Sequence, residues 1–232
     1  MRRFYKQVAV TSLAKDLFGI VLDDRPVKTP AKAMLAVASQ TLATAMADEW
    51  RAQGDVINPH AMPFTGLANA AIDHVGPDPM VFATALAAYA ESELLCYRAT
   101  EDQADLATRQ DQIWGPLLDW ARQRYDVSFT IVTGIIHQPQ PQKTLARLRD
   151  AVAAQPAFVL AALQPIITIT GSCVIGLALA EGHLTGEAAF DAAHLDELWQ
   201  EENWGADHFA LETRNAHRAD MMAAVQFMAL LG

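Results

Sequence analysis

Three side chains near the C-terminus have the types and spacing of metal ligands. His208 and Glu212 are four residues apart, and His217 follows on the same predicted helix. Because positions i and i+4 lie on one face of a helix, the first two can face the same point. A zinc or iron site needs further ligands, for which His194 and Asp196 are the candidates. The alternative is a solvated helix face, where such pairs are common, and we therefore expect no metal.

The motifs of nucleotide-binding and hydrolytic enzymes are absent. The chain has no GxGxxG, GxxxxGK[ST] or GxSxG pattern, and the glycine of Gly171-Ser172 follows no predicted strand, as a phosphate-binding loop requires. Small residues that let two helices approach closely explain Gly171 and Gly176 better. Seven histidines could form a triad in space, but triads are recognised by geometry and not by spacing. We predict no enzymatic activity and no cofactor.

A segment near the C-terminus combines carboxylates with tryptophans. Its acids are Asp196, Glu197, Glu201, Glu202, Asp207 and Glu212, and its tryptophans are Trp199 and Trp204. One interpretation is a solvated helix face, because surface charge is generally tolerated. The other is a docking surface, because tryptophan contributes strongly at protein contacts. Core packing is the alternative role for the tryptophans.

The composition is that of an acidic folded chain. It has 232 residues, a formal net charge of −10 and 52% hydrophobic residues, which is enough for one large or two modest domains. The acidic charge and the scattered basic residues argue against a nucleic-acid partner. Cys96 and Cys173 lie far apart in helix-like surroundings, which favours free buried thiols, although spacing leaves a disulfide open. The first residues form no apolar stretch, so we expect no secretory signal.

One uncharged stretch is long enough to require a membrane test. Residues 151–180 carry no charge, and a spanning helix needs about 20 apolar residues. Pro156 and Pro165 interrupt this stretch, and neither flank has the Lys/Arg cluster that anchors membrane helices. We predict a buried helical hairpin and no integral membrane insertion. A peripheral membrane protein that uses residues 157–180 is an alternative.

The first forty residues have β-type patterns. Residues 5–11 alternate, residues 18–22 form an apolar run, and Asp23-Asp24 separates this run from residues 25–29. This spacing predicts a hairpin with a two-residue turn. Residues 34–37 predict a further short strand.

From Ser39 onward the period becomes helical. We expect Ser39 to be the N-cap and Gly54 the C-cap of the first helix. A second helix is predicted over residues 65–75, and the Gly/Pro cluster at residues 76–79 ends it.

The remainder has almost only helical patterns. We expect helices over residues 79–97, 106–125, 142–154, 157–163, 166–179 and 185–203, and from Gly205 to about Leu231, with a short β-prone run at 128–133. The predicted fold class is therefore α+β. Residues 1–77 would form an α/β domain with a small antiparallel sheet, and residues 78–232 a mainly α-helical domain.

Blocks of sequence along the whole chain resemble the ATP12 family. They are residues 4–8, 22–30, 49–54, 57–59, 62–63, 67–69, 71–73, 94–99, Gln110, 114–120, 171–172, 177–179, 196–200, 204–205 and Asp207. The chain departs from the family pattern in two places. The hairpin turn, usually Asp-Gly, is Asp23-Asp24 here. Ala206 and Phe209 are neutral where the family often has acids, which weakens a functional claim for each acid nearby.

The resemblance implies an assembly chaperone of the F1 sector of ATP synthase. Such proteins bind the F1 α subunit before ring assembly and have an N-terminal α/β part and a C-terminal helical part. The resemblance also implies a cytoplasmic location in a bacterium and the mitochondrial matrix for eukaryotic relatives. We predict that the partner-binding residues are Asp196, Glu197, Trp199, Gln200, Trp204, Asp207 and Glu212. A metal-dependent enzyme of unknown reaction is the alternative from a different class.

Overall fold

The computed structural model describes all 232 residues and divides into two compact units. The first, here the sheet unit, contains Met1–Pro79, Pro156–Ala162 and Ala223–Gly232; the second, here the helical unit, contains Met80–Gln155 and Leu163–Met222. The sheet unit thus includes two segments from beyond residue 79. The division into two domains at residue 77 stays a prediction.

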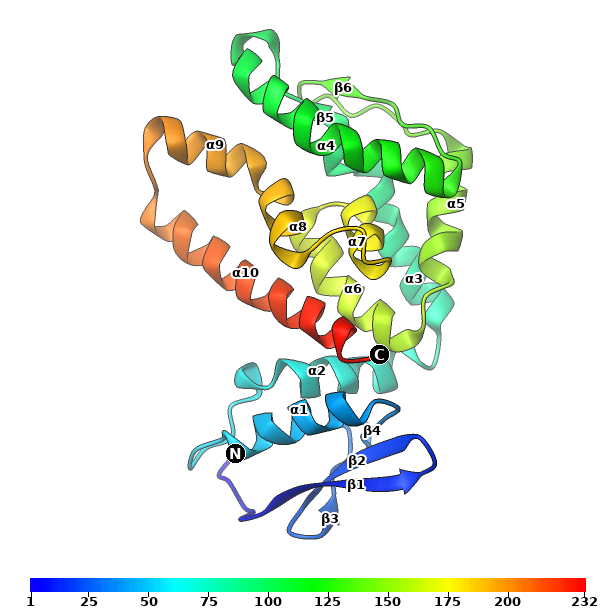
Figure 1. Cartoon of the computed structure of the whole chain (residues 1–232), viewed down its shortest axis with the longest axis vertical. Coiled ribbons are helices and arrows are strands. Elements are labelled where there is room, and N and C mark those ends of the chain that lie inside the picture. Colours follow the sequence, from blue (N-terminus) through cyan, green and yellow to red (C-terminus); the bar gives the residue numbers. More distant parts are fainter. The chain divides into compact units, whose positions relative to one another are not determined.

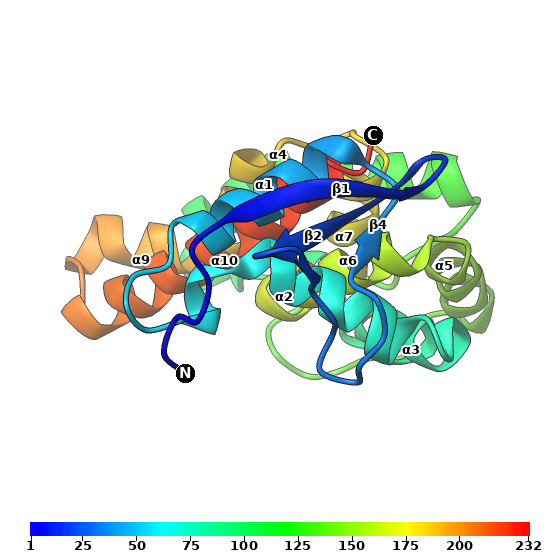
Figure 2. The same cartoon turned by 90° about the horizontal axis from the view of Figure 1, so that it is seen from below.

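The sheet unit is built from four short strands and two helices. Its elements are β1 (Val8–Ala14), β2 (Leu17–Leu22), β3 (Arg25–Pro26), β4 (Ala36–Val37), α1 (Gln40–Arg51), the 3-10 turn η1 (Pro59–Ala61), α2 (Pro63–Ala70) and its π-helical continuation η2 (Ala71–Val75). The strands are antiparallel, in the order β1-β2-β3, with β4 also paired to β2. Helix α1 contacts β1 and β2 (Figure 2). The expected small antiparallel sheet is confirmed.

The β2–β3 hairpin has the predicted two-residue turn. Leu22 pairs with Arg25, and Asp23 and Asp24 have φ of +47° and +66°. The first strand was predicted from Tyr5 but begins at Val8. Tyr5 is instead buried, and its hydroxyl donates to the Trp50 carbonyl at 2.7 Å.

Helix α1 begins as predicted but ends earlier. The Ser39 hydroxyl accepts from the Leu42 N–H at 3.3 Å, which confirms the N-cap. Ala52 is the C-cap, so the assignment of Gly54 was wrong. The next helix, α2, starts at Pro63, two residues before the predicted start. Glu49 of α1 accepts hydrogen bonds from N–H groups in the first turn of α2. Since these amides have no partner inside the helix, a carboxylate there is stabilising.

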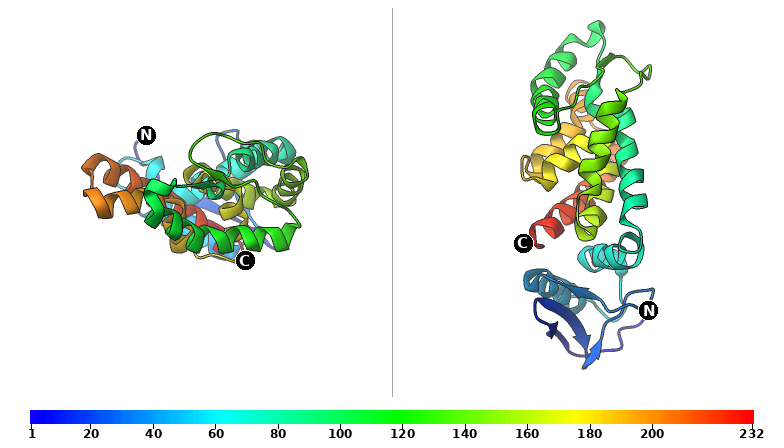
Figure 3. Two further views of the ribbon diagram at one scale, coloured as in Figure 1. Left: turned by 90° about the horizontal axis from the view of Figure 1, so that it is seen from above. Right: turned by 90° about the vertical axis from the view of Figure 1, so that its right-hand side faces the viewer.

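The helical unit contains most of the helices of the chain. Its elements are α3 (Pro79–Ala87), the 3-10 segments η3 (Ala88–Ser92), η4 (Leu94–Cys96) and η5 (Glu101–Gln103), β5 (Tyr97–Arg98), α4 (Ala104–Tyr125), β6 (Val132–Thr133), α5 (Gln142–Ala153), α6 (Ala157–Thr170), α7 (Cys173–Ala180), α8 (Gly186–Ala193), α9 (Leu195–Trp204) and α10 (His208–Ala229). Helices α6 and α10 each continue into the sheet unit. Helix α5 runs beside η3 (Figure 3). The α+β class is confirmed.

The uncharged stretch forms α6 and α7. Helix α6 continues through Pro165 to Thr170, so the break predicted at this proline was wrong. Gly171, with φ of +62°, separates it from α7, of which every residue from Cys173 to Leu179 is buried. A Cβ atom on Gly176 would lie 2.6 Å from Cγ1 of Ile167, which supports close helix packing at this residue. For Gly171 that interpretation was wrong, because its positive φ divides the helix predicted over residues 166–179. None of the helices combines the length and the apolar character that a membrane span requires.

Two predicted helices are broken by side chains that form distant or local contacts. The helix predicted over residues 79–97 is shorter, since α3 ends at Ala87 and continues as the 3-10 segment η3 to Ser92. The next residue, Glu93, is fully buried and accepts from the Val174 N–H of α7 at 3.1 Å. The helix predicted over 185–203 is broken at His194, whose ring stacks on Phe190 at 3.9 Å and whose Nδ1 lies 2.9 Å from the Phe190 carbonyl oxygen. Cys96 and Cys173 are both buried and free.

Candidate functional site

The candidate site lies in the helical unit, between α9 and the first half of α10. The two helices are joined by a short connection (Figure 1) in which Gly205 has φ of +87°. Asp207 then caps α10, since its carboxylate accepts from the Phe209 and Ala210 N–H groups at 2.8 and 3.0 Å. Between the helices is a depression of about 600 Å³, here the α9–α10 depression. Its lining residues are Glu197, Gln200, Glu201, Trp204, Gly205, Asp207, Phe209, Ala210, Leu211, Thr213, Arg214 and His217.

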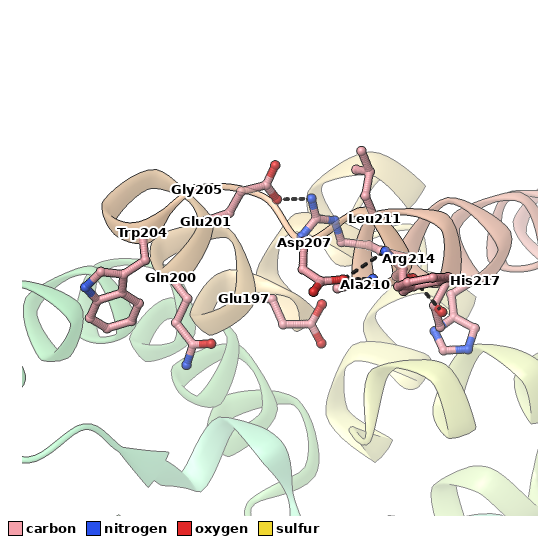
Figure 4. A pocket seen from close by; sticks show the side chains of 12 residues that line it. Glu197, Gln200, Glu201, Trp204, Gly205, Asp207, Ala210, Leu211, Arg214 and His217 are labelled. Atoms are coloured by element: carbon pink, nitrogen blue, oxygen red, sulfur yellow. Dashed lines mark hydrogen bonds and ion pairs between the residues drawn. The ribbon is translucent and has the colours of Figure 1, made fainter.

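Three of the six carboxylates of the segment are engaged by neighbouring basic or imidazole groups. Glu201 pairs with Arg214 across the depression (Figure 4), and Glu202 pairs with Arg109 of α4 at 2.7 Å. Glu212 lies 3.3 Å from His208. These contacts, together with the capping role of Asp207, give four of the acids a local structural partner.

The remaining two acids, Asp196 and Glu197, have no cation bound to them. Glu197 is exposed, and its carboxylate points into the α9–α10 depression (Figure 4). Asp196 is half-buried, and its Oδ1 accepts from Nε2 of Gln110 at 2.8 Å. Burial raises the pKa of Asp196 because the charged form loses hydration. The interpretation of the acids as a solvated helix face therefore does not hold for Asp196, which Gln110 of α4 binds on its half-buried side.

The tryptophans of the segment form a pair with different exposure. Trp199 is half-buried, and its ring meets that of Trp204 edge-to-face at 5.3 Å. Trp204 itself is 69% exposed, and Phe209 at the start of α10 is 76% exposed. Sequence reasoning missed Phe209, because a large apolar residue in a helical pattern ordinarily indicates the core.

Gln200 connects the site to a second depression. It lines the α9–α10 depression and also a depression of about 310 Å³ that contains Asp196. Helix α9 thus presents Glu197 to one depression and Asp196 to the other. The structure brings Glu197, Gln200, Trp204 and Asp207 together, whereas Trp199 lies beside Glu101–Asp105.

The candidate metal ligands do not converge. His208 and Glu212 are exposed and near each other, and His217 lines the α9–α10 depression. No group of three or more His, Cys, Asp or Glu side chains has an arrangement that could hold a metal ion. The geometry at this site is that of a charged and aromatic surface.

Comparisons with known proteins place the chain in a family. The family model described as ATP12 chaperone protein matches residues 2–122, a range that does not include the α9–α10 depression. The crystal structure of Atp12 from Paracoccus denitrificans is similar, with 35% identity and a TM-score of 0.92 over 100% of this chain and 98% of that one. A mutant of that protein, in which lysine replaces an aspartate, matches equally well.

A third solved structure, the Atu1473 protein from Agrobacterium tumefaciens, is 40% identical, with a TM-score of 0.92. The match covers 100% of this chain and 86% of that protein. Both the family model and these whole-chain similarities agree with the sequence blocks described above. The chain therefore belongs to the ATP12 chaperone family.

Proposed function

We propose that this protein is an assembly chaperone of the F1 sector of ATP synthase that binds the F1 α subunit before ring assembly. The observation that carries the proposal is the α9–α10 depression, where exposed Trp204 and Phe209 lie beside the unpaired carboxylate of Glu197. Membership of the chaperone family supplies the general role, and this surface supplies a means of holding a client.

The chemistry of the surface suits a client that is held and then released. A ring subunit without its neighbours exposes apolar interfaces, and such patches promote aggregation. Exposed aromatic side chains such as Trp204 and Phe209 can anchor on them. The carboxylates around them favour encounter with a basic surface and keep the contact partly polar. Such a contact can be specific without being permanent.

We further propose that the protein acts by binding and not by catalysis, and that it works in the cytoplasm of a bacterium. The family assignment supports a binding role, and the absence of the enzyme motifs named above is consistent with it. The family resemblance is the basis for the proposed location.

Capture of the F1 α subunit from the same organism tests the proposal. The tagged chaperone is co-expressed with α, and bound α is measured after purification. We expect Glu197→Lys to weaken capture by about tenfold or more, because it places a positive charge where a basic surface must approach, and Trp204→Ala to weaken it by removing an anchor. Glu91→Lys is the matched control, since Glu91 is an exposed acid of η3 without an ion pair.

Asp196→Lys belongs in the same series but needs a fold control. It removes the acceptor for Gln110, so its melting temperature has to be compared with that of Glu197→Lys. If the wild-type chain captures no α, the proposed client is wrong. If it captures α and Glu197→Lys and Trp204→Ala do so equally well, the binding surface is elsewhere, and residues 54–63 are the next to test.

A further inference from the structure

Two adjacent isoleucines in the helical unit are exposed after β6. Ile135 is 95% and Ile136 is 75% exposed, and Ile131 before the strand is 43% exposed. Single exposed apolar residues are ordinary, but a group of them indicates a contact surface. We call residues 134–137 the isoleucine loop.

Hydrogen bonds brace the isoleucine loop on both sides. The Gly134 N–H donates to the Arg98 carbonyl of β5 at 2.8 Å, and Nδ1 of His137 lies 3.1 Å from the Tyr97 hydroxyl. Beyond it, buried Gln140 bonds with its side-chain amide to both the N–H and the carbonyl of Thr130. The isoleucines are therefore displayed by a loop that is fixed to a two-stranded parallel sheet.

The second depression lies directly beside this loop. Its lining residues are Tyr97, Arg98, Ala99, Thr100, Gln103, Leu106, Gln110, Gly134, Ile135, Asp196 and Gln200. Ile135, Leu106 and Tyr97 supply apolar surface, while Asp196 and Gln200 supply polar groups. A side chain that enters the depression would thus meet both an apolar wall and a carboxylate.

The carboxylate of Asp196 retains hydrogen-bonding capacity. Its Oδ1 accepts from Gln110, which is almost fully buried and whose own Oε1 accepts from the Ala99 N–H at 2.7 Å. The nearby guanidinium of Arg98 is committed elsewhere: it pairs with Asp111 at 2.9 Å, donates to the Leu95 carbonyl and lies over the Trp114 ring. Asp196 is therefore positioned by a buried amide, and no cation forms an ion pair with it.

We propose that the isoleucine loop and the adjoining depression form a second docking subsite, which takes a client segment with a lysine or arginine against Asp196 and an aliphatic side chain against Ile135 and Ile136. Charge complementarity favours this occupant, because the helical unit has nineteen acidic and nine basic residues. The same excess disfavours a second copy of the chain. The chain's own basic N-terminus is engaged, since Arg3 donates to the Gln53 carbonyl. That the client is the F1 α subunit rests on the proposed function.

The first test uses a peptide and needs no α subunit. The ¹⁵N-labelled full chain is titrated with Ac-Ala-Leu-Arg-Leu-Ala-NH₂ and with the matched peptide in which glutamate replaces arginine. We expect the arginine peptide to shift the amide signals of Ala99 and Ile135 and the side-chain amide of Gln110, and the glutamate peptide to leave them in place. Asp196→Asn should abolish these shifts. Absence of shifts with the arginine peptide, or equal shifts with both, would overturn the subsite.

The second test uses the α subunit and a matched apolar control. The double variant Ile135→Ser, Ile136→Ser should weaken capture of α about tenfold with an unchanged melting temperature, because both side chains are exposed. The control is Met80→Ser, Val81→Ser, which removes another exposed apolar pair of the same unit, and it should capture α normally.

The outcomes separate the subsite from the proposed function. If Glu197→Lys loses α but the isoleucine variant keeps it, the subsite is wrong and the proposed function stands. If the wild type captures no α but the arginine peptide binds as expected, the subsite stands and the client is another protein. If the wild type sediments as a dimer that the isoleucine variant abolishes, a second copy is the occupant and the inference is wrong.

Discussion

The two units of the molecule differ in charge as well as in construction. The sheet unit has eight basic and eight acidic residues, whereas the helical unit has nine and nineteen, so the whole net charge of −10 belongs to the helical unit. That unit also contains the α9–α10 depression and the isoleucine loop. Charge and exposed apolar groups therefore occur together on one unit, which is the combination that a partner-binding surface requires.

Both units nevertheless fix a helix in the same way. In the sheet unit, Glu49 of α1 accepts from the Phe64 and Thr65 N–H groups at the start of α2, at 2.6 and 2.8 Å. In the helical unit, Glu93 accepts from Val174 at the start of α7. The difference is burial, since Glu49 is half-buried and Glu93 is fully buried. The same device is thus more costly to ionise in the unit with the larger core.

The largest expected effect comes from replacing the titratable carboxyl group of Glu93, the buried cap. Burial raises the pKa of Glu93 to about 7, whereas a carboxyl in an unfolded chain has a pKa of about 4.3. Between these pH values the folded state keeps a proton that the unfolded state releases. The stability that protonated Glu93 contributes is therefore complete below about pH 4.3 and is lost as the pH rises to about 7, by on the order of 3 kcal/mol.

Glu93→Gln should remove this pH dependence. The free energy of unfolding, measured in urea from pH 4.5 to 8, should fall more steeply for the wild type than for the variant. Glu49→Gln is the matched control: burial also raises the pKa of Glu49, against the hydrogen bonds from Thr65 and Phe64, so its slope should change in the same direction but less. Equal changes for both variants would contradict the contrast in burial between the units.

A smaller effect is expected from adding one methyl group to a helix in each unit. Gly176 of α7 faces Ile167, where a Cβ atom would be 2.6 Å from Cγ1 and 3.1 Å from Cδ1. Gly66 of α2 has no atom within 4 Å of such a Cβ. Gly176→Ala should therefore lose about 1–3 kcal/mol through overpacking, and Gly66→Ala should gain up to about 1 kcal/mol through helix propensity.

Urea unfolding followed by circular dichroism measures both alanine variants. Opposite signs would show that the helical unit has the tighter helix packing at these positions. A gain for Gly176→Ala would show that the side chain of Ile167 moves aside, and the proposed role of the small residue would then be wrong.

The features that could be predicted from the sequence are those set by neighbouring residues. Ser39 caps α1 through a bond to Leu42, three positions away, and Thr185 opens α8 in the same way through Ala188. The hairpin turn depends only on Asp23 and Asp24. In each case the pattern contains both partners within a few residues, so local stereochemistry is sufficient.

The features that could not be predicted depend on partners far along the chain. The helical segment η3 ends before Glu93, whose side chain accepts from Val174, 81 positions away, although the apolar pattern continues past it. Asp196 points inward because Gln110, 86 positions away, holds it. The acids and tryptophans of the α9–α10 segment could be recognised from the sequence. Which of those acids lack a cation could not be predicted, because the cations come from distant positions, such as Arg109 for Glu202.

The smallest effect is expected in the sheet unit, at the turn between β2 and β3. Both central residues have positive φ, which glycine adopts without steric cost, but only one of them has a further role. The Asp23 carboxylate accepts from the Lys6 and Gln7 N–H groups at 3.0 and 2.8 Å, and these bonds, chiefly that from Gln7, lower its pKa. Asp24 is exposed and its side chain makes no hydrogen bond.

Asp24→Gly should therefore be neutral or stabilising by at most about 1 kcal/mol, because relief of strain is opposed by the greater entropy of the unfolded chain. Asp23→Gly makes the same change of backbone but should be destabilising. The loss should shrink at a pH low enough to protonate Asp23 in the wild type. The reason is that the contribution of a carboxylate with a lowered pKa disappears as the pH falls through that pKa. Urea unfolding at neutral and acidic pH compares the pair. A loss above about 2 kcal/mol for Asp24→Gly would mean that its side chain, and not only its backbone, stabilises the turn.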